Sequence, residues 1–456
     1  MKVLLIQPNS VTARGILTPP LALLFVGEIA RLHGHEVRIL DRNVDFNTRN
    51  FIKKFKPDVV GISVFTGPLV KDAITISTFI KEELGDETKV IWGGIHPSLL
   101  PEETVSNSYI DAVVIGEGEL TFVELLAALE KRSNLSEVKG ICYKENGRII
   151  TTPERGFLDL DTMPLTNWSL INAKRYLDLE IVMVTSRGCP YNCYFCYNQA
   201  FNKRKWRAQS AERVLDEIRR VESLTSNRHL KFHDDNFTVN KERVIKILKG
   251  LSKNYSLYIE TRPEHVDKDF LDALKKFRKV WLFIGVETGS EVLLKSMNKM
   301  ITLEVVRKAF KLIQPYKNIF TTASVILGLP GETYEESLAT VAFVKSLKPT
   351  WITYCGYTPY PGSYYYDSLI AQGVLKVPHD TLAWASYTTP EIGRLYSQGS
   401  TISKAWKREL RKLNFQSWVD VFINILLKRD FHKIYRFCKD KVLRFPLRCL
   451  SVLGRD

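Results

Sequence analysis

The sequence of 456 residues has no long hydrophobic run and little cysteine. No stretch reaches the roughly 18 uninterrupted apolar residues of a membrane span. Gln7, Pro8 and Asn9 interrupt the first apolar run, which therefore reads as a strand and not as a signal peptide. Seven cysteines in so long a chain do not resemble a disulfide framework, and reduced thiols suit a reducing compartment. We therefore expect a cytoplasmic protein of two or three domains.

Acidic residues are scarce near the end of the chain. Residues 401–456 contain fourteen Lys or Arg against five Asp or Glu, so they carry nine of the fifteen net positive charges. Aromatic residues are interspersed among these charges, at Trp418, Phe422, Phe431, Tyr435 and Phe437. The pattern predicts an amphipathic helix at the inner face of a membrane or a basic helix packed on the protein surface. Nucleic-acid binding is disfavoured because no recognition module accompanies the charge.

Residues 1–135 lack the G-x-G-x-x-G motif of dinucleotide-binding domains after their first strand. Five short apolar runs alternate there with helical patterns, which predicts an α/β fold, a Rossmann-like (flavodoxin-like) domain with a five-stranded parallel sheet. Ligands of such sheets bind at the carboxyl ends of the strands. Small residues follow three of these strands, at Ser63, Thr66, Gly67, Gly93, Gly94 and Gly116. They allow a bulky planar ligand to approach the backbone, although tight turns also use glycine.

Three further segments are expected. Residues 136–178 contain a hairpin, turning at Asn146-Gly147, and a linker. Residues 179–370 contain six strand patterns alternating with helices, which predicts a partial (β/α)6 barrel of the TIM type with its catalytic groups at the C-terminal rim. Residues 371–456 are expected to form a mainly helical region that covers the substrate.

Cys189, Cys193 and Cys196 are packed into one short loop that has no fourth cysteine nearby. A structural zinc site closes with four protein ligands. Three thiolates suit an iron–sulfur cluster in which one iron has no protein ligand and can bind another molecule. A structural metal knuckle remains the alternative from these residues alone, but the loop follows the first barrel strand and so lies on the rim, which favours the cluster.

The motif Cys189-Pro-Tyr-Asn-Cys193-Tyr-Phe-Cys196 at this position resembles the signature of the radical S-adenosylmethionine superfamily. The resemblance implies that the three cysteines hold a 4Fe-4S cluster and that S-adenosylmethionine chelates the open iron. It also implies an electron donor, such as a flavodoxin or ferredoxin, and cleavage of S-adenosylmethionine to a 5′-deoxyadenosyl radical that abstracts hydrogen from a substrate.

Later rim segments resemble the places where this family binds its nucleotide. The resemblance implies that Asp234 and Asp235 in HDDNF accept hydrogen bonds from the substrate ammonium, and that Arg262 pairs with the methionyl carboxylate. Glu287 would bind the ribose hydroxyls. Val325, in SVILGLPGE, and Phe195 would lie against the adenine. A helix cap, a surface ion pair or a simple turn is the alternative for these segments taken singly.

Residues 1–135 resemble the cobalamin-binding domain that precedes the radical domain in one large subgroup of the superfamily. The resemblance rests on IQPN, GISVFTG, WGGIHPSLLPE and VIGEGE, which includes Glu117. The sequence lacks the D-x-H-x-x-G motif whose histidine binds cobalt. His96 would then contact the corrin side or a phosphate. A domain that keeps the fold without the cofactor is the alternative.

With both cofactors, the leading function is methylation of an unactivated carbon. A cyclase or other radical reaction without methyl transfer is a second hypothesis, and a zinc-stabilised protein that binds a membrane surface is a third. Trp384 and the tyrosines in residues 358–367 could form an apolar wall of the acceptor pocket. Together with the basic tail, they suggest a lipid-like or other poorly soluble natural product as the substrate.

Overall fold

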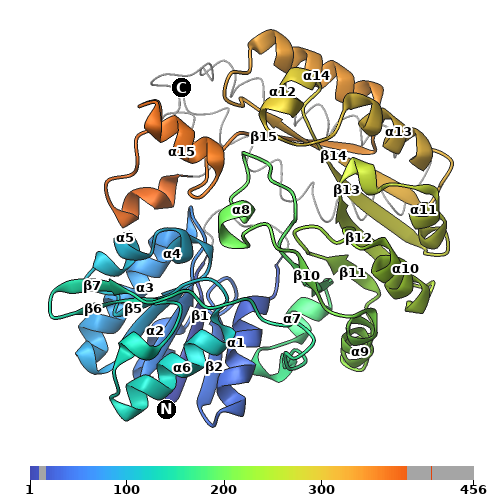
Figure 1. Cartoon of the computed structure of the whole chain (residues 1–456). Helices are drawn as coiled ribbons and strands as arrows, with labels where there is room; N and C mark the ends of the chain where they lie inside the picture. Colours follow the sequence, from blue (N-terminus) through green and yellow to red (C-terminus); the bar gives the residue numbers. More distant parts are fainter. Residues whose placement is uncertain (10–16, 388–411, 413–456) are drawn as a thin grey trace, which may run out of the picture.

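The computed structural model describes residues 1–9, 17–387 and 412. Two α/β units lie side by side, the first coloured blue to teal in Figure 1 and the second green to orange. In the described part of the chain, no helix is long and apolar enough to cross a membrane. The basic aromatic-rich tail predicted for residues 401–456 lies outside the described residues except for Lys412.

The first unit is built on a seven-stranded sheet with the order β2-β1-β3-β4-β5-β6-β7. Its strands are β1 (Lys2–Gln7), β2 (Glu36–Asp41), β3 (Val59–Ser63), β4 (Lys89–Gly93), β5 (Ala112–Val114), β6 (Ile141–Glu145) and β7 (Arg148–Thr151). The first five are parallel in the flavodoxin-like order, as predicted.

The hairpin β6-β7 corrects the predicted domain boundary. The sequence placed it in a connecting segment, residues 136–178, but β6 pairs antiparallel with β5. Without it, β5 would leave an open sheet edge. Ile141 and Cys142 of β6 are fully buried, so the hairpin also adds apolar contacts to the core of the first unit.

Helices cover both faces of the first sheet. They are α1 (Leu21–Leu32), α2 (Thr48–Phe55), α3 (Leu69–Leu84), α4 (Ile95–Leu99), α5 (Pro101–Ser106) and α6 (Gly118–Lys131). Since β3 is covered on both faces, Val59, Val60 and Ile62 are all buried. Gly27 lets α1 lie close to the sheet, because a Cβ there would stand 3.2 Å from Ile39 and from Leu5.

The second unit has six parallel strands in the order β8-β11-β12-β13-β14-β15. They are β8 (Ile181–Met183), β11 (His229–Phe232), β12 (Ser256–Thr261), β13 (Lys279–Glu287), β14 (Ile319–Leu327) and β15 (Trp351–Gly356). β9 (Ser186–Arg187) and β10 (Arg207–Ala208) form a separate short antiparallel pair. The partial barrel is confirmed.

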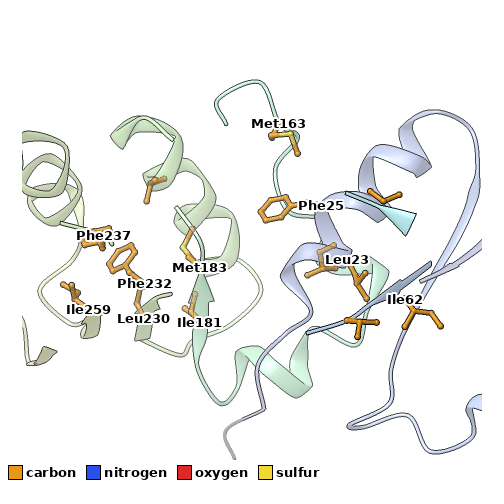
Figure 2. Close-up of a cluster of buried hydrophobic side chains, with 14 of the residues drawn as sticks. Leu23, Phe25, Ile62, Met163, Ile181, Met183, Leu230, Phe232, Phe237 and Ile259 are labelled. Carbon is orange, nitrogen blue, oxygen red and sulfur yellow. The ribbon is translucent and has the colours of Figure 1, made fainter. Parts of the chain in front are cut away.

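Helices alternate with the barrel strands. They are α7 (Lys174–Leu177), α8 (Asn198–Phe201), α9 (Ala211–Glu222), α10 (Lys241–Gly250), α11 (Lys268–Leu274), α12 (Glu291–Ser296), α13 (Leu303–Ile313), α14 (Tyr334–Ser346) and α15 (Tyr364–Ala371). Ser210, Asn240 and Asp267 cap α9, α10 and α11 by accepting from backbone N–H groups, which fixes where these helices begin. Figure 2 shows the packed core, in which Phe232 and Phe237 stack at 4.2 Å.

A short 3-10 helix, Thr381–Ser386, makes hydrogen bonds to the first unit. Trp384 Nε1 donates to Glu103 Oε1 at 2.7 Å, and Asn107 Nδ2 donates to Thr381 Oγ1 at 2.8 Å. Trp384 is 0% exposed and packs against Tyr387. The expectation that it forms a wall of the acceptor pocket is therefore wrong in this arrangement, because its indole is used to join the two units.

Candidate active site

A cavity of about 530 Å³ lies between the two units, and its lining is mainly apolar. The first unit contributes the carboxyl ends of β1, β3, β4 and β5, including the β1/β3 switch point at which such sheets bind ligands. The second unit contributes Ser186 and Arg187 at the start of the cysteine loop, Tyr197 at its end, and Asp235. The ligand edge of the first sheet therefore faces the cysteine loop across one space.

Most of the predicted small residues line this cavity. They are Ser63, Gly93, Gly94 and Gly116, whereas Thr66 and Gly67 lie outside the lining. Gly94 and Gly116 have φ values of 97° and 75°, so their turns require glycine whether or not a ligand binds. Gly93 is different, because a Cβ there would meet nothing closer than Val114 Cβ at 3.8 Å. The space above Gly93 belongs to the cavity.

His96 lies away from this cavity. Its ring is 0% exposed, lies 5.6 Å from the ring of Trp384, and places Nδ1 3.2 Å from Thr66 Oγ1. Nε2 is buried without a hydrogen-bond partner. The structure therefore gives no support to the predicted contact of His96 with a corrin or phosphate, since its ring projects from α4 onto Trp384 of the 3-10 helix and is buried there.

The burial of His96 predicts a loss of stability in acid. Burial lowers its pKa from 6.5 to about 4. Below pH 6.5 the unfolded chain binds this proton and the folded chain does not, so the free energy of unfolding falls until the pH reaches about 4. The expected loss is about 3 kcal/mol. Urea unfolding across this pH range should show a smaller acid loss in His96→Gln, and an equal loss in both proteins would contradict the account.

Four charged residues form an ion cluster between the two units. Arg187 Nη1 donates to Glu117 Oε1 at 2.9 Å, Arg187 Nη2 donates to Glu119 Oε1 at 2.5 Å, and Arg207 Nη2 donates to Glu117 Oε1 at 2.8 Å. Burial alone would raise the pKa of Glu117, but Arg207 and Arg187 hold it below its usual value. Glu117 lines the cavity, but its carboxylate is already held by two arginines, so its role in binding a cofactor stays a prediction. Sequence reasoning missed both arginines.

Two aspartates accept hydrogen bonds from the residues that lead into the cysteine loop. Thr185 donates to Asp234 through its backbone N–H at 2.5 Å and through Oγ1 at 2.7 Å. Gly188 N donates to Asp235 Oδ2 at 2.8 Å. A Cβ on Gly188 would lie 2.1 Å from Lys205 O, so only glycine fits before Cys189. Asp234 is thus occupied in shaping the loop, whereas Asp235 also faces the cavity.

The three thiols influence one another electrostatically. Burial, together with negative charge on Cys193 and Cys189, raises the pKa of Cys196 to about 12. Burial also raises the pKa of Cys189. Arg262 Nη1 donates to Cys193 Sγ at 3.5 Å, and Asn236 Nδ2 donates to Cys189 Sγ at 3.8 Å. Three thiols on one loop, two of them with N–H donors, fit an iron–sulfur cluster, whose positive charge stabilises thiolates.

The thiols are not drawn together as a finished metal centre. In residues 1–9, 17–387 and 412, no three His, Cys, Asp or Glu side chains are grouped closely enough to hold a metal ion. Among the described cysteines, the loop supplies one ligand fewer than a closed tetrahedral zinc site needs, because Cys142 is buried in β6 of the first unit and Cys355 stands on β15.

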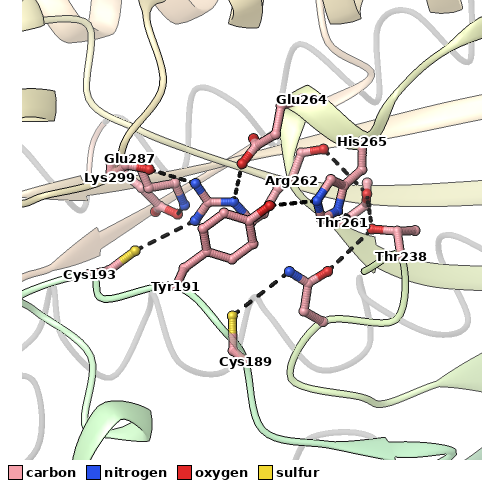
Figure 3. A network of polar contacts seen from close by, with 11 residues as sticks. Cys189, Tyr191, Cys193, Thr238, Thr261, Arg262, Glu264, His265, Glu287 and Lys299 are labelled. Carbon is pink, nitrogen blue, oxygen red and sulfur yellow. Dashed lines mark hydrogen bonds and ion pairs between the residues drawn. The ribbon is translucent and has the colours of Figure 1, made fainter. Parts of the chain in front are cut away.

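The other predicted nucleotide contacts gather beside Arg262. Lys299 Nζ donates to Glu287 Oε1 at 2.6 Å and lies 5.9 Å from the centre of the Phe195 ring. Val325 is buried on β14, in register with Glu287. Figure 3 shows Glu287 and Lys299 beside Arg262, next to the cysteine loop. Lys299 could not be predicted from the sequence, because its contact with Glu287 depends on the path of the chain after α12.

The guanidinium of Arg262 already makes hydrogen bonds and a ring contact within the protein. Nε donates to Glu264 at 2.5 Å, Nη2 donates to Lys299 O at 2.5 Å, and the guanidinium stacks 3.7 Å from the centre of the Tyr191 ring. With Nη1 on Cys193, each of its three nitrogens has a partner within the protein. Its pairing with a methionyl carboxylate therefore stays a prediction.

The fold and site define an enzyme class in which a flavodoxin-like ligand domain and a barrel rim with three cysteines share one cavity. Comparisons with known proteins agree. The family model described as the radical SAM superfamily matches residues 183–344, and the one described as the B12 binding domain matches residues 11–126.

Relatives match nearly the whole chain. It is 34% identical over 405 residues to an uncharacterized methyltransferase of Pyrococcus horikoshii, covering 85% of this chain and 86% of the relative. It is 26% identical to the anaerobic magnesium-protoporphyrin IX monomethyl ester cyclase of Rubrivivax gelatinosus, with 81% and 70% covered. It is also 26% identical to the hopanoid C-3 methylase of Methylococcus capsulatus, with 80% and 71% covered.

A solved structure shares the fold of both units. The radical S-adenosylmethionine methyltransferase TsrM of Kitasatospora setae matches with a TM-score of 0.69 at 21% identity, covering 82% of this chain and 77% of that one. The chain therefore belongs to the radical SAM superfamily, in the group that carries an N-terminal B12-binding domain. It is an enzyme of the radical SAM methyltransferase type, and the cofactors of its family are those predicted from the sequence.

Proposed function

We propose that the enzyme uses a 4Fe-4S cluster, S-adenosylmethionine and cobalamin to methylate an unactivated carbon. The observation that carries the proposal is the single cavity lined both by the strand ends of the B12-binding domain and by the two ends of the cysteine loop. A methyl carrier held by the first unit would then face a radical source held by the second. When bound, the cluster supplies the electron that cleaves S-adenosylmethionine, and cobalamin supplies the methyl carrier.

Different residues of this chain would bind the three groups. Cys189, Cys193 and Cys196 would hold the cluster, and Asp235 and Glu287 would orient S-adenosylmethionine. Cobalamin would lie over Gly93. The N-terminal unit contributes no histidine to the described lining of the cavity, and His233 comes from the second unit. This agrees with the missing D-x-H-x-x-G motif and favours cobalamin without a histidine ligand from its own domain.

The cobalamin part of the proposal predicts that Gly93→Leu blocks binding. The new side chain meets no protein atom closer than 3.8 Å at its Cβ, so it should extend into the cavity without disturbing the fold. We expect at least a tenfold weaker affinity for cobalamin, measured by equilibrium dialysis of the anaerobic protein, with an unchanged unfolding temperature without ligand. Gly156→Leu, at an exposed glycine with nothing within 4 Å of its Cβ, is the matched control. Equal affinity in both variants would contradict the placement.

The proposed acceptor is a natural product or a lipid-like molecule. The apolar lining of the cavity and the likeness to a hopanoid methylase support this class. Methyl-labelled S-adenosylmethionine should transfer its label to material in an organic-phase extract supplied as acceptor. Label confined to the aqueous extract would contradict a lipid-like acceptor, and a product that gains no methyl would point to cyclisation or another radical reaction.

The proposal includes an electron donor of the flavodoxin or ferredoxin class, since cleavage of S-adenosylmethionine consumes one electron. A reduced flavodoxin should support 5′-deoxyadenosine formation as a chemical reductant does. Activity with the chemical reductant alone would contradict this choice of donor.

A further inference from the structure

A continuous chain of hydrogen bonds runs from Tyr191, inside the cysteine motif, around to Cys189. Tyr191 OH lies 2.7 Å from His265 Nε2, and His265 Nδ1 lies 2.8 Å from Thr238 Oγ1. Thr238 Oγ1 donates to Asn236 Oδ1 at 3.2 Å, and Asn236 Nδ2 donates to Cys189 Sγ at 3.8 Å. Figure 3 shows these side chains arranged as an arc beside Arg262.

In one direction every member of the chain donates to the next, with Thr238 Oγ1 also accepting from Thr261 Oγ1, which lies 2.7 Å away. Thr238 has a single hydroxyl proton, and if it is given to Asn236, His265 must donate to Thr238 through Nδ1–H. The neutral imidazole then has its lone pair on Nε2, where it accepts from Tyr191. Burial lowers the pKa of His265, which favours this neutral form. Each member donates to the next, and hydrogen bonds in such a chain strengthen one another.

The direction also decides how the Asn236 amide lies. Because Oδ1 accepts from Thr238, the NH2 group must point toward Cys189. Asn236 is 2% exposed, and Trp206 Nε1 donates to its backbone oxygen at 3.1 Å, so the residue is fixed at both backbone and side chain. An amide held in this way directs one N–H group at Cys189 Sγ.

Cys193 has a different donor. Arg262 supplies a guanidinium N–H and a full positive charge to this thiol at 3.5 Å. Two of the three cysteine sulfurs thus receive donors from side chains that bind no metal. Hydrogen bonds to cluster sulfurs stabilise the more negative, reduced form and raise the reduction potential.

We infer that the relay Tyr191–His265–Thr238–Asn236 is a positioning device that sets the reduction potential of the cluster through Cys189. The inference rests on the proposed function, since it needs the cluster. Its members are positioning residues and touch no substrate. Their effect should appear in the potential of the cluster and not in its presence.

The test is an anaerobic redox titration of the reconstituted full-length enzyme, followed by electron paramagnetic resonance. Asn236→Ala should make reduction about tenfold less favourable, a fall of about 59 mV for one electron. Tyr191→Phe and His265→Leu should lower the reduction potential of the cluster by less than Asn236→Ala does. In these two variants the Asn236 amide is still present, but the hydrogen bonds that orient it are interrupted. His265→Gln, which can still accept and donate, should restore most of the loss.

Tyr255→Phe is the matched control, because Tyr255 is buried and its OH donates to Glu222 at 2.7 Å, outside the relay. The reduction potential of the cluster in Tyr255→Phe should equal that in the unmodified enzyme. A second measurement is the exchangeable-proton coupling of the reduced cluster after transfer to D2O, part of which should disappear in Asn236→Ala.

Iron and sulfide analysis separates the possible failures. Absence of a cluster from the unmodified enzyme would overturn the proposed function. A full cluster with the same potential in Asn236→Ala and in the unmodified enzyme would overturn the relay. If Asn236→Ala does not load iron, the His265→Leu and His265→Gln pair decides, because His265 touches no cysteine, and equal potentials in that pair would also overturn the relay.

Discussion

Replacing Cys196 with alanine is expected to abolish the cluster and the formation of 5′-deoxyadenosine. In the proposed site the three thiols of the motif are the protein ligands, so losing one would leave two ligands for a four-iron cluster. Burial and nearby negative charge raise the pKa of the Cys196 thiol to about 12, and water would replace this ligand poorly. Iron and sulfide content of anaerobically reconstituted protein, with product analysis by mass spectrometry, measures both effects.

Cys355→Ala is the control for this change. Cys355 stands on β15, outside the cysteine loop, and should be dispensable for loading iron. An intact cluster in Cys196→Ala would contradict the ligand assignment. Loss of iron in both variants would show that the assignment is incomplete.

Replacing Arg187 with methionine is expected to produce the largest loss of stability. Arg187 lies between Glu117 and Glu119, so its loss leaves two carboxylates buried near one remaining cation, Arg207. Breaking a buried ion pair by removing one partner costs about 3–5 kcal/mol. For a chain of this size, we expect the unfolding temperature to fall by about 3–5 °C. Differential scanning calorimetry measures it.

Arg219→Met is the matched control, because Arg219 pairs with Asp216 on the surface and its side chain is 64% exposed. Such pairs contribute about 0–1 kcal/mol. Because Arg187 also lines the shared cavity, Arg187→Met should weaken cobalamin binding there as well. An Arg187→Met protein as stable as the Arg219→Met protein would show that the ion cluster does not hold the units together.

The sequence predicts the elements of this fold well because their signals are local. The short apolar runs SLYIET and WITYCG form two of the six expected barrel strands, β12 and β15, and the helical pattern LEVVRKAFKLI forms α13. The cysteine motif was equally local. Its spacing and its place after a strand were sufficient to predict the cluster loop.

Features that depend on pairings across the chain escaped prediction. Arg187 and Arg207 reach Glu117 across 70 and 90 residues, and no periodicity signals such a contact. Trp384 reads as a pocket residue by type, but its contact with Glu103, 281 residues away, makes it part of a fastening between the units. His96 follows a strand end like a ligand residue, yet its direction was decided by Trp384 packing over it.

The central claim is that the two cofactor sites serve one reaction across one cavity. The most direct measurement gives the anaerobically loaded and reduced enzyme methyl-labelled S-adenosylmethionine and an acceptor extract, and then quantifies products by mass spectrometry. The account predicts 5′-deoxyadenosine, S-adenosylhomocysteine and a methyl-labelled acceptor, with the labelled acceptor lost in Gly93→Leu. An enzyme that holds its cluster and cobalamin but forms 5′-deoxyadenosine without S-adenosylhomocysteine or any labelled acceptor would contradict it.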